Sequence, residues 1–362
     1  MVRDFEEYKK RHLSFWELQE IDRPLIGFTL GMGLDSWSYW QYNQATRALL
    51  NQGKISPQDI HPEAFVEDQL NYLELFQNIP QDVCTSAMPL ASIPWMEAVL
   101  GCPVVSTEAG FKSIEILENV EKFEAHPFNP QNSWVEKYLE FIEVYSRALG
   151  HKYPVAQSVL RGPSDLTSAL LGAENAVIEL MTHPQEMQHL LEYVTDHLGA
   201  FLEIQLRHLP RFHDGYVIGQ YDIWCPQPGI RIQEDFTVLY SPQLYREFIQ
   251  PMDERLAALA PYSLLHLHSS SLFLIEQFLE VSSIRAFQVT KDPGSAQLSD
   301  MMPGLCKIQQ AGKPLIVKGQ FDLTDLELMK ENLTCAGLSI QPVVKNIFEA
   351  EKLLPFLNNW QE

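Results

Sequence analysis

The chain has 362 residues, of which 46% are hydrophobic, and it carries a formal net charge of −21. This size and composition suit one large domain or two small ones with a substantial core. The negative field repels nucleic acid and anionic membranes, and no apolar run reaches the roughly 18 residues of a transmembrane helix.

The N-terminus and the cysteines indicate a cytoplasmic protein. The first ten residues, MVRDFEEYKK, are charged and lack the apolar core of a signal peptide. The five cysteines are odd in number, widely spaced and without a CxxC pair, which argues against a disulfide framework or a zinc ribbon.

Short apolar runs recur along the chain, and helix-like segments lie between them. Several runs are nearly continuously apolar, as in parallel strands that are buried on both faces. We expect eight strands, at residues 24–30, 82–88, 154–160, 216–222, 262–268, 284–290, 314–319 and 338–344.

Amphipathic patterns predict the intervening helices. The candidates are residues 174–190, 242–251, 272–279 and 348–356, and Ser241 followed by Pro242 is typical of a helix N-terminus. Alternation of strand and helix indicates a parallel α/β sheet, and eight strands favour a single (β/α)8 barrel. A Gly-x-Gly-x-x-Gly turn is missing, which weakens the dinucleotide-binding alternative. We therefore expect an N-terminal helical extension over 1–22 and a TIM barrel over 23–362.

In such barrels the active site lies at the carboxyl ends of the strands. Polar and aromatic residues gather there, and we predict that they bind the substrate, with Asp222 also able to act as a base or a ligand. Each prediction has a structural alternative. Asp222 and Asp235 would be carboxylates that stabilise loops, the tryptophans would pack in the core or the barrel wall, and Arg161 would form an ion pair with a neighbouring acid. The predicted substrate-binding residues are Trp37, Arg161, Gln220, Tyr221, Trp224, Asp235 and Gln320.

Two histidines give the sharpest signal. His266 and His268 end one predicted strand, and the period of two places both on one face, with Leu265 and Leu267 on the other. Paired imidazoles can bind a metal such as zinc or transfer protons. The structural alternative is that one ring packs in the core. We predict His266 and His268 as metal ligands, and His268 with Asp222 as catalytic residues.

Several short sequence segments, taken in their order along the chain, resemble the uroporphyrinogen decarboxylase and cobalamin-dependent methyltransferase superfamily. The resemblance covers roughly residues 80–350 and implies a (β/α)8 barrel. The fragments are IPWMEAVLGCP at 93–103, RGPSDL at 161–166, QEDF at 233–236, SPQLYREF at 241–248, LHLHSS at 265–270 and GQFD at 319–322.

The chain departs from both branches of that family. The family's decarboxylases carry arginines near the N-terminus, whereas here the first strand is followed by GMGLDSW, and no arginine lies between that strand and Arg47. The methyltransferases hold zinc with His-x-Cys and a distant cysteine. Here His266-Leu-His268 replaces the pair, and Cys335 precedes the last strand instead of ending it.

The resemblance implies three functions, in this order. The first is a corrinoid-dependent methyltransferase that moves a methyl group between a small substrate and a corrinoid (cobalamin) on a separate protein, with zinc as cofactor. The second is a decarboxylase-like lyase that acts on a carboxylate without a metal. The third is a non-catalytic tetrapyrrole-binding barrel. The expected partners are a small-molecule substrate, a corrinoid protein and a second copy of the chain, with neither nucleic acid nor membrane.

Overall fold

The computed structural model describes residues 5–31 and 43–360, which form a mixed α/β fold. Its centre is a seven-stranded parallel sheet in the order β1-β12-β11-β10-β9-β8, with β2 paired to β12. The strands are β1 (Leu25–Ile26), β2 (Thr29–Leu30), β8 (Gly229–Gln233), β9 (Tyr262–His268), β10 (Ala286–Lys291), β11 (Leu315–Gly319) and β12 (Leu338–Val344).

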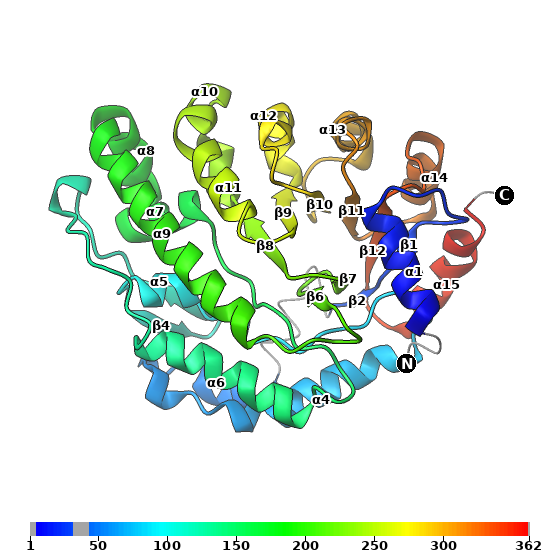
Figure 1. The fold of residues 1–362 in the computed structure, drawn as a ribbon, viewed down its shortest axis with the longest axis horizontal. Helices are drawn as coiled ribbons and strands as arrows, with labels where there is room; N and C mark the ends of the chain where they lie inside the picture. The colour runs from blue at the N-terminus through cyan, green and yellow to red at the C-terminus, as the bar shows by residue number, and fades with distance from the viewer. Residues whose placement is uncertain (1–4, 32–42, 361–362) are drawn as a thin grey trace.

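Helices lie outside this sheet and continue beyond its β8 edge (Figure 1). They are α7 (Pro163–Leu171), α8 (Ala173–Thr182), α9 (Pro184–His208), α10 (Pro242–Leu244), α11 (Gln250–Ala257), α12 (Ile275–Glu280), α13 (Leu298–Gln310), α14 (Leu323–Asn332) and α15 (Ile347–Asn358). Shorter 3-10 turns are η1 (Pro57–Asp59), η2 (Pro62–Phe65), η3 (Phe76–Asn78), η4 (Val120–Lys122), η5 (Asp235–Leu239) and η7 (Ser269–Leu274), and η6 (Tyr245–Ile249) is a π-helix.

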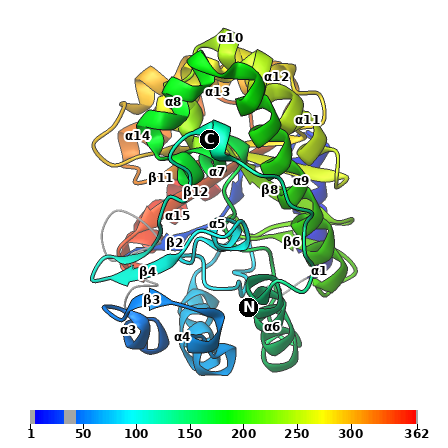
Figure 2. The same cartoon turned by 90° about the vertical axis from the view of Figure 1, so that its left-hand side faces the viewer.

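The remaining elements come mainly from the first half of the chain, and α4 and α6 lie on the opposite side of the molecule from α10 and α12 (Figures 1 and 2). The helices are α1 (Phe5–Trp16), α3 (Gln44–Leu49), α4 (Val66–Leu75), α5 (Trp95–Val99) and α6 (Ser133–Ala148). The strands β3 (Gly53–Ile55), β4 (Val104–Thr107) and β5 (Gly110–Ser113) form an antiparallel sheet, and β6 (Tyr216–Ile218) and β7 (Ile223–Cys225) form a hairpin.

The strand pattern of the second half of the chain follows the prediction closely. β9 and β12 span the expected residues, and β10 and β11 differ from expectation by one or two residues at their ends. Leu265 and Leu267 of β9 belong to the large core cluster, while Leu264, on the opposite strand face, packs in a separate cluster with Ile223 and Ile316. The predicted alternation of faces in β9 is therefore confirmed.

Other predicted elements differ from the structure. The expected strand 216–222 is instead the hairpin of β6 and β7, because Gln220 (φ 67°) and Asp222 (φ 55°) adopt left-handed conformations that turn the chain back. The expected helix 174–190 is two helices, α8 and α9, which divide at Pro184 because proline cannot continue the hydrogen bonding of α8. β8 was not predicted, since the central Arg231 interrupts its apolar pattern.

The segments predicted as the second and third strands make only isolated strand contacts. Residues 82–88 and 154–160 share one parallel bridge, between Ala87 and Val155. The Asp82 amide donates to the Ile26 carbonyl at one edge of the sheet (2.8 Å). The structure thus has the expected parallel sheet, but its described residues do not form eight regular strands, and a barrel is not established by strand pairing.

A side chain links residues 154–160 to β8. The buried Gln157 amide donates to the Arg231 carbonyl (2.9 Å) and accepts from the Arg231 amide (3.1 Å). One side chain therefore satisfies both backbone groups of a buried edge residue, as a neighbouring strand would. This contact joins the first half of the chain to the parallel sheet.

Replacing Gln157 with leucine should destabilise the protein by about 2 to 6 kcal/mol, because it leaves the Arg231 amide and carbonyl buried without partners, each at about 1–3 kcal/mol. Denaturant unfolding measures this loss. The same change at the exposed Gln131 serves as a control and should have little effect. Equal stabilities of the two variants would contradict the bridging role of Gln157.

Helix α1 is attached to the rest of the fold by a buried histidine. His12 is fully buried, its Nδ1 accepts from the Trp224 amide (3.0 Å), and its Nε2 lies 3.0 Å from the Asp82 carbonyl oxygen. These partners require the neutral ring with its proton on Nε2. Burial lowers the pKa of His12 to about 4 from an ordinary value of 6.5.

None of the helices in the described ranges has the length and apolarity to cross a membrane.

The buried His12 should make stability depend on pH. Below pH 6.5 the unfolded chain binds a proton at His12 that the folded protein does not bind until about pH 4. The free energy of unfolding should therefore fall as pH drops through this range, by at most about 1.4 kcal/mol per pH unit. Chemical denaturation at a series of pH values should show a shallower slope for His12→Gln than for wild type, whereas His126→Gln, at an exposed site, should keep the wild-type slope.

Candidate functional site

A cleft of about 1000 Å³ lies at the carboxyl ends of the parallel strands. Its walls include the ends of β8, β9, β10 and β11 and part of the β4–β5 hairpin. The polar side chains that line it include Arg161, Asp165, Gln220, Gln233, Asp235, His266, His268, Asp292, Lys318 and Gln320. Carboxyl ends of parallel strands meet at one edge, so residues distant in sequence converge here.

The register of β9 places the two histidines side by side. His266 lies opposite Gln233 of β8 and Gln288 of β10, and His268 lies opposite Thr290 of β10. Both rings project from the same strand face, and their Nε2 atoms are 3.3 Å apart. Because His266 is 5% exposed and His268 sits at the strand end, the pair forms a half-buried polar centre in the cleft wall.

Asp235 completes this centre from the end of β8. Its Oδ2 lies 3.5 Å from His268 Nε2, and its Oδ1 lies 3.9 Å from His266 Nε2. The Gln233 side chain donates to Asp235 Oδ2 (2.5 Å), while the Asp235 amide donates to the Asp165 carboxylate (3.2 Å). One atom from each of Asp235, His266 and His268 lies within 4.8 Å of the others, an arrangement that can hold a metal ion. We call these three residues the Asp–His–His cluster.

Further hydrogen bonds orient the two rings from behind. His268 Nδ1 lies 2.7 Å from Asp292 Oδ1, and His266 Nδ1 contacts both Gln288 Oε1 and the Tyr221 hydroxyl. The Gln288 amide nitrogen donates to Thr290, so its oxygen faces His266 and accepts from Nδ1. This leaves the unprotonated Nε2 of His266 facing Asp235 and His268, as a metal ligand requires.

The two rings differ in charge. Burial lowers the pKa of His266 to about 3, with Arg231 adding to the effect, so this ring is neutral. Burial acts in the same direction on His268, but its hydrogen bonds with Asp235 and Asp292 outweigh burial and raise its pKa to about 10. A cation therefore belongs between these two carboxylates. The His268 proton supplies this charge.

The remaining predicted site residues are only partly brought together. Arg161 lines the cleft and pairs with the buried Glu97 (3.3 Å), and Gln320 lines it as well. Tyr221 is buried beneath His266. Trp224 lies away from the cleft, because it packs beneath α1 with its indole donating to the Phe212 carbonyl. Trp37 lies outside the described residues.

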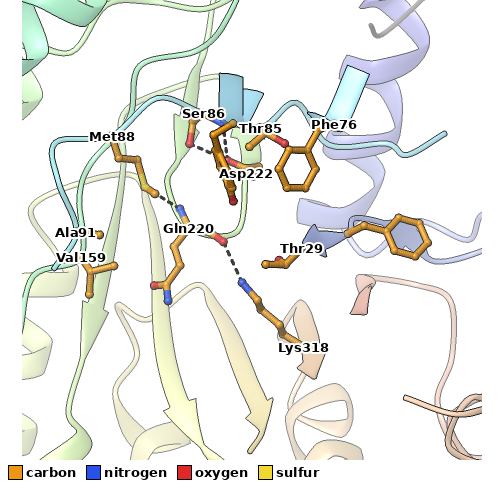
Figure 3. Close-up of a pocket in the computed structure, with 12 residues that line it drawn as sticks. Thr29, Phe76, Thr85, Ser86, Met88, Ala91, Val159, Gln220, Asp222 and Lys318 are labelled. Atoms are coloured by element: carbon orange, nitrogen blue, oxygen red, sulfur yellow. Dashed lines mark hydrogen bonds between the residues drawn. The ribbon is translucent and has the colours of Figure 1, made fainter. Parts of the chain in front are cut away.

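Asp222 and Gln220 border a second, smaller pocket of about 30 Å³ (Figure 3). Asp222 Oδ1 accepts from the amide and the hydroxyl of Ser86 (2.9 and 2.7 Å), and burial raises the pKa of this carboxyl to about 6. Asp222 is therefore separated from the cleft that contains the Asp–His–His cluster, whereas Gln220 lines both spaces.

Three residues near the site are not among those predicted to form it. Asp292 begins Asp-Pro-Gly, a sequence typical of turns, and Gln288 lies inside the strand predicted at residues 284–290. Lys318 had a visible signal, since it is a lone charge at the end of the apolar run Leu315-Ile-Val. Cys335, the cysteine nearest the last strand, is not among the residues that line the cleft.

Comparisons with known proteins support the fold. No protein-family model matches the sequence, and no curated protein is significantly similar to it. Among solved structures, a methyltransferase from Methanosarcina mazei is similar, with a TM-score of 0.66 over 98% of this chain and 99% of that one. The two sequences are 13% identical, so the match shows a shared fold and leaves the chemistry to be argued from the site.

Proposed function

We propose that this protein is a metal-dependent methyltransferase of the uroporphyrinogen decarboxylase superfamily. It transfers a methyl group between a small substrate and a corrinoid on a separate protein that docks over the cleft. The Asp–His–His cluster in the cleft wall carries this proposal. The full-length structural match to a protein named a methyltransferase agrees with it, although similarity of fold alone does not establish the reaction.

The proposal includes a closed barrel as the scaffold. Residues 82–88 adjoin β1 through Asp82, residues 154–160 adjoin β8 through Gln157, and the two segments meet at the Ala87–Val155 bridge. These contacts connect both edges of the parallel sheet. We infer an irregular (β/α)8 barrel over 23–362, to which residues 1–22 add a helical extension.

The distances within the cluster fit zinc. Ligand atoms about 2.1 Å from a tetrahedral zinc ion are roughly 3.4 Å apart. The two Nε2 atoms are 3.3 Å apart, His268 Nε2 is 3.5 Å from Asp235 Oδ2, and His266 Nε2 is 3.9 Å from the other oxygen, Asp235 Oδ1. With one ligand atom from each residue, all three atoms lie within 4.8 Å of one another. Three protein ligands leave a fourth position for substrate, as in catalytic zinc sites. Bound zinc would act as a Lewis acid and would keep a thiol as its thiolate.

Each neighbouring residue then has a defined task. Asp292 and Gln288 hold the imidazole rings so that both Nε2 atoms face Asp235. Gln233 and Asp165 hold Asp235 in the same way. Arg161, Gln220 and Gln320 line the cleft, where they would orient the substrate.

Zinc binding tests the cluster directly. We expect one equivalent of zinc per chain by elemental analysis. His266→Ala, His268→Ala and Asp235→Ala should lose it. Asp292→Asn should weaken binding about 10- to 100-fold, because the group that orients His268 loses its negative charge. Affinities are measured by competition with a chromogenic chelator. His126→Gln is the matched control, and zinc retained at full affinity by His266→Ala would refute the cluster as the site.

Methyl transfer tests the function. Zinc-loaded protein should convert cob(I)alamin to methylcobalamin with at least one donor from a panel of methylated thiols, amines and ethers, followed by visible absorbance. His268→Ala should lower the rate by more than about 100-fold, since it removes a Lewis acid worth several kcal/mol. Failure of every donor with folded, zinc-replete protein would count against the methyltransferase.

One observation favours a lyase as the second candidate. His268 faces the cleft and its Nδ1 is 2.7 Å from the Asp292 carboxylate, a geometry suited to a proton donor for a decarboxylation that needs no metal. A protein that binds no zinc, yet releases carbon dioxide from a carboxylate in a His268-dependent reaction, would establish this alternative.

A further inference from the structure

The small pocket at the inner end of the cleft has the features of a binding site in its own right. It lies between the end of β11, the turn that joins β6 to β7, and residues 85–88 (Figure 3). Gln220 and Lys318 line both the pocket and the cleft, so the two spaces adjoin. Its volume of about 30 Å³ is that of two or three water-sized spheres, which suits a group of a few atoms.

A buried ammonium group faces this pocket. Lys318 is 6% exposed, and among the described residues its Nζ makes one hydrogen bond, a long one of 3.4 Å to the Gln220 carbonyl. Figure 3 shows Lys318 reaching from β11 toward Gln220, with Thr29 beside it. An ammonium group has three donors, and leaving donors of a buried charge unmet is costly. The Lys318 ammonium group can therefore donate hydrogen bonds to an acceptor on a ligand.

Other polar atoms around the pocket are also without partners. Thr85 is 8% exposed, and its hydroxyl oxygen is buried with no hydrogen bond among the described residues. The side-chain oxygen of Gln220 is also buried without a hydrogen bond among the described residues. By contrast, Asp222 already accepts two hydrogen bonds from Ser86 through one oxygen. Of these groups, the Lys318 ammonium and the Thr85 hydroxyl can donate to an anionic ligand, whereas the Gln220 oxygen can only accept.

The backbone of the adjoining turn, residues 219–222, is strained. Gln220 and Asp222 both have positive φ, which non-glycine residues adopt rarely and at a cost of order 1–3 kcal/mol each. The preceding Gly219 lies so close to the Gln157 carbonyl that a Cβ atom would clash with it. Packing against residues 154–160 holds the turn in this conformation, which directs the Gln220 carbonyl to Lys318.

We propose that this pocket binds the carboxylate end of the substrate, with Lys318 as its counter-ion and Thr85 as a hydroxyl donor. The rest of the molecule would extend into the cleft toward the Asp–His–His cluster. A carboxylate has three heavy atoms and one negative charge, which match the volume and the unmet donors. Identification of the ligand as the methyl-transfer substrate rests on the proposed function, whereas recognition of a carboxylate at Lys318 does not.

The charge state of Lys318 agrees with this role. Burial lowers its pKa to about 8, against the opposing effect of Asp222. The side chain is therefore still mostly protonated at neutral pH and can pair with an anion. Asp222 lines the same pocket, and burial raises the pKa of its carboxyl to about 6, so it is mostly ionised at neutral pH and accepts from Ser86.

The test is binding of (methylthio)acetate to full-length protein stripped of metal, compared with the neutral amide of the same molecule. Saturation-transfer NMR on the methyl signal gives both affinities. We expect the carboxylate to bind at least about tenfold more tightly than the amide. Lys318→Met should abolish that preference, and the isosteric Thr85→Val should reduce carboxylate affinity about three- to tenfold. Lys313→Met, at the opposite end of β11, is the matched control and should bind like wild type.

The outcomes separate this pocket from the proposed reaction. Metal-free His266→Ala should keep the carboxylate preference, because the cluster is not part of the pocket. A preference that depends on Lys318 without any methyl transfer would support the pocket while refuting the methyltransferase. Equal affinity for acid and amide in wild type, or an unchanged preference in a folded Lys318→Met, would overturn the proposal. Should Lys318→Met fail to fold, an unchanged affinity in Thr85→Val would overturn the assigned hydroxyl donor.

Discussion

The candidate site depends on the register of one strand. β9 pairs with β8 and β10 so that Gln233, His266 and Gln288 form one row across three strands, and His268 and Thr290 extend it toward the cleft. A shift of one residue in either pairing would move the imidazoles to the opposite face, among the aliphatic side chains that pack under the outer helices. Because Leu265 and Leu267 occupy that face, their burial holds the histidines in the cleft.

The cost of burying polar groups explains the surroundings of this row. Arg231, Gln233 and Asp235 follow one another along β8 and beyond it, and their side chains are hydrogen-bonded in series. Arg231 donates to Gln233 and to the Leu160 carbonyl, Gln233 donates to Asp235, and the Asp235 backbone amide donates to Asp165. The Gln157 amide replaces a missing strand partner in the same way. Side-chain hydrogen bonds thus replace, on this side of the sheet, the regular strand pairing that joins the strands from β8 through β12. This side of the sheet is therefore irregular.

The cleft and the small pocket that adjoins it therefore favour ligands of opposite charge. The Asp–His–His cluster presents lone pairs and negative charge, which favour a metal cation. The pocket at Lys318 presents a buried cation, which favours an anion. A small molecule with a carboxylate at one end and a methylated heteroatom at the other would match both. Such a molecule would be oriented by this separation of charge, even though the protein as a whole carries a net charge of −21.

The sequence alone determined the local features: the apolar runs of β9 to β12, the period of two that puts His266 and His268 on one face, and the polar residues at strand ends. These depend on neighbours a few positions apart. Tertiary structure decided what those residues meet. Asp235 and Asp292 are 33 and 24 positions from His268, and Gln220 is 98 from Lys318. Such contacts follow from strand order, register and the strained turn at 219–222, which depend on the packing of the whole chain and have no signature in any short stretch of it.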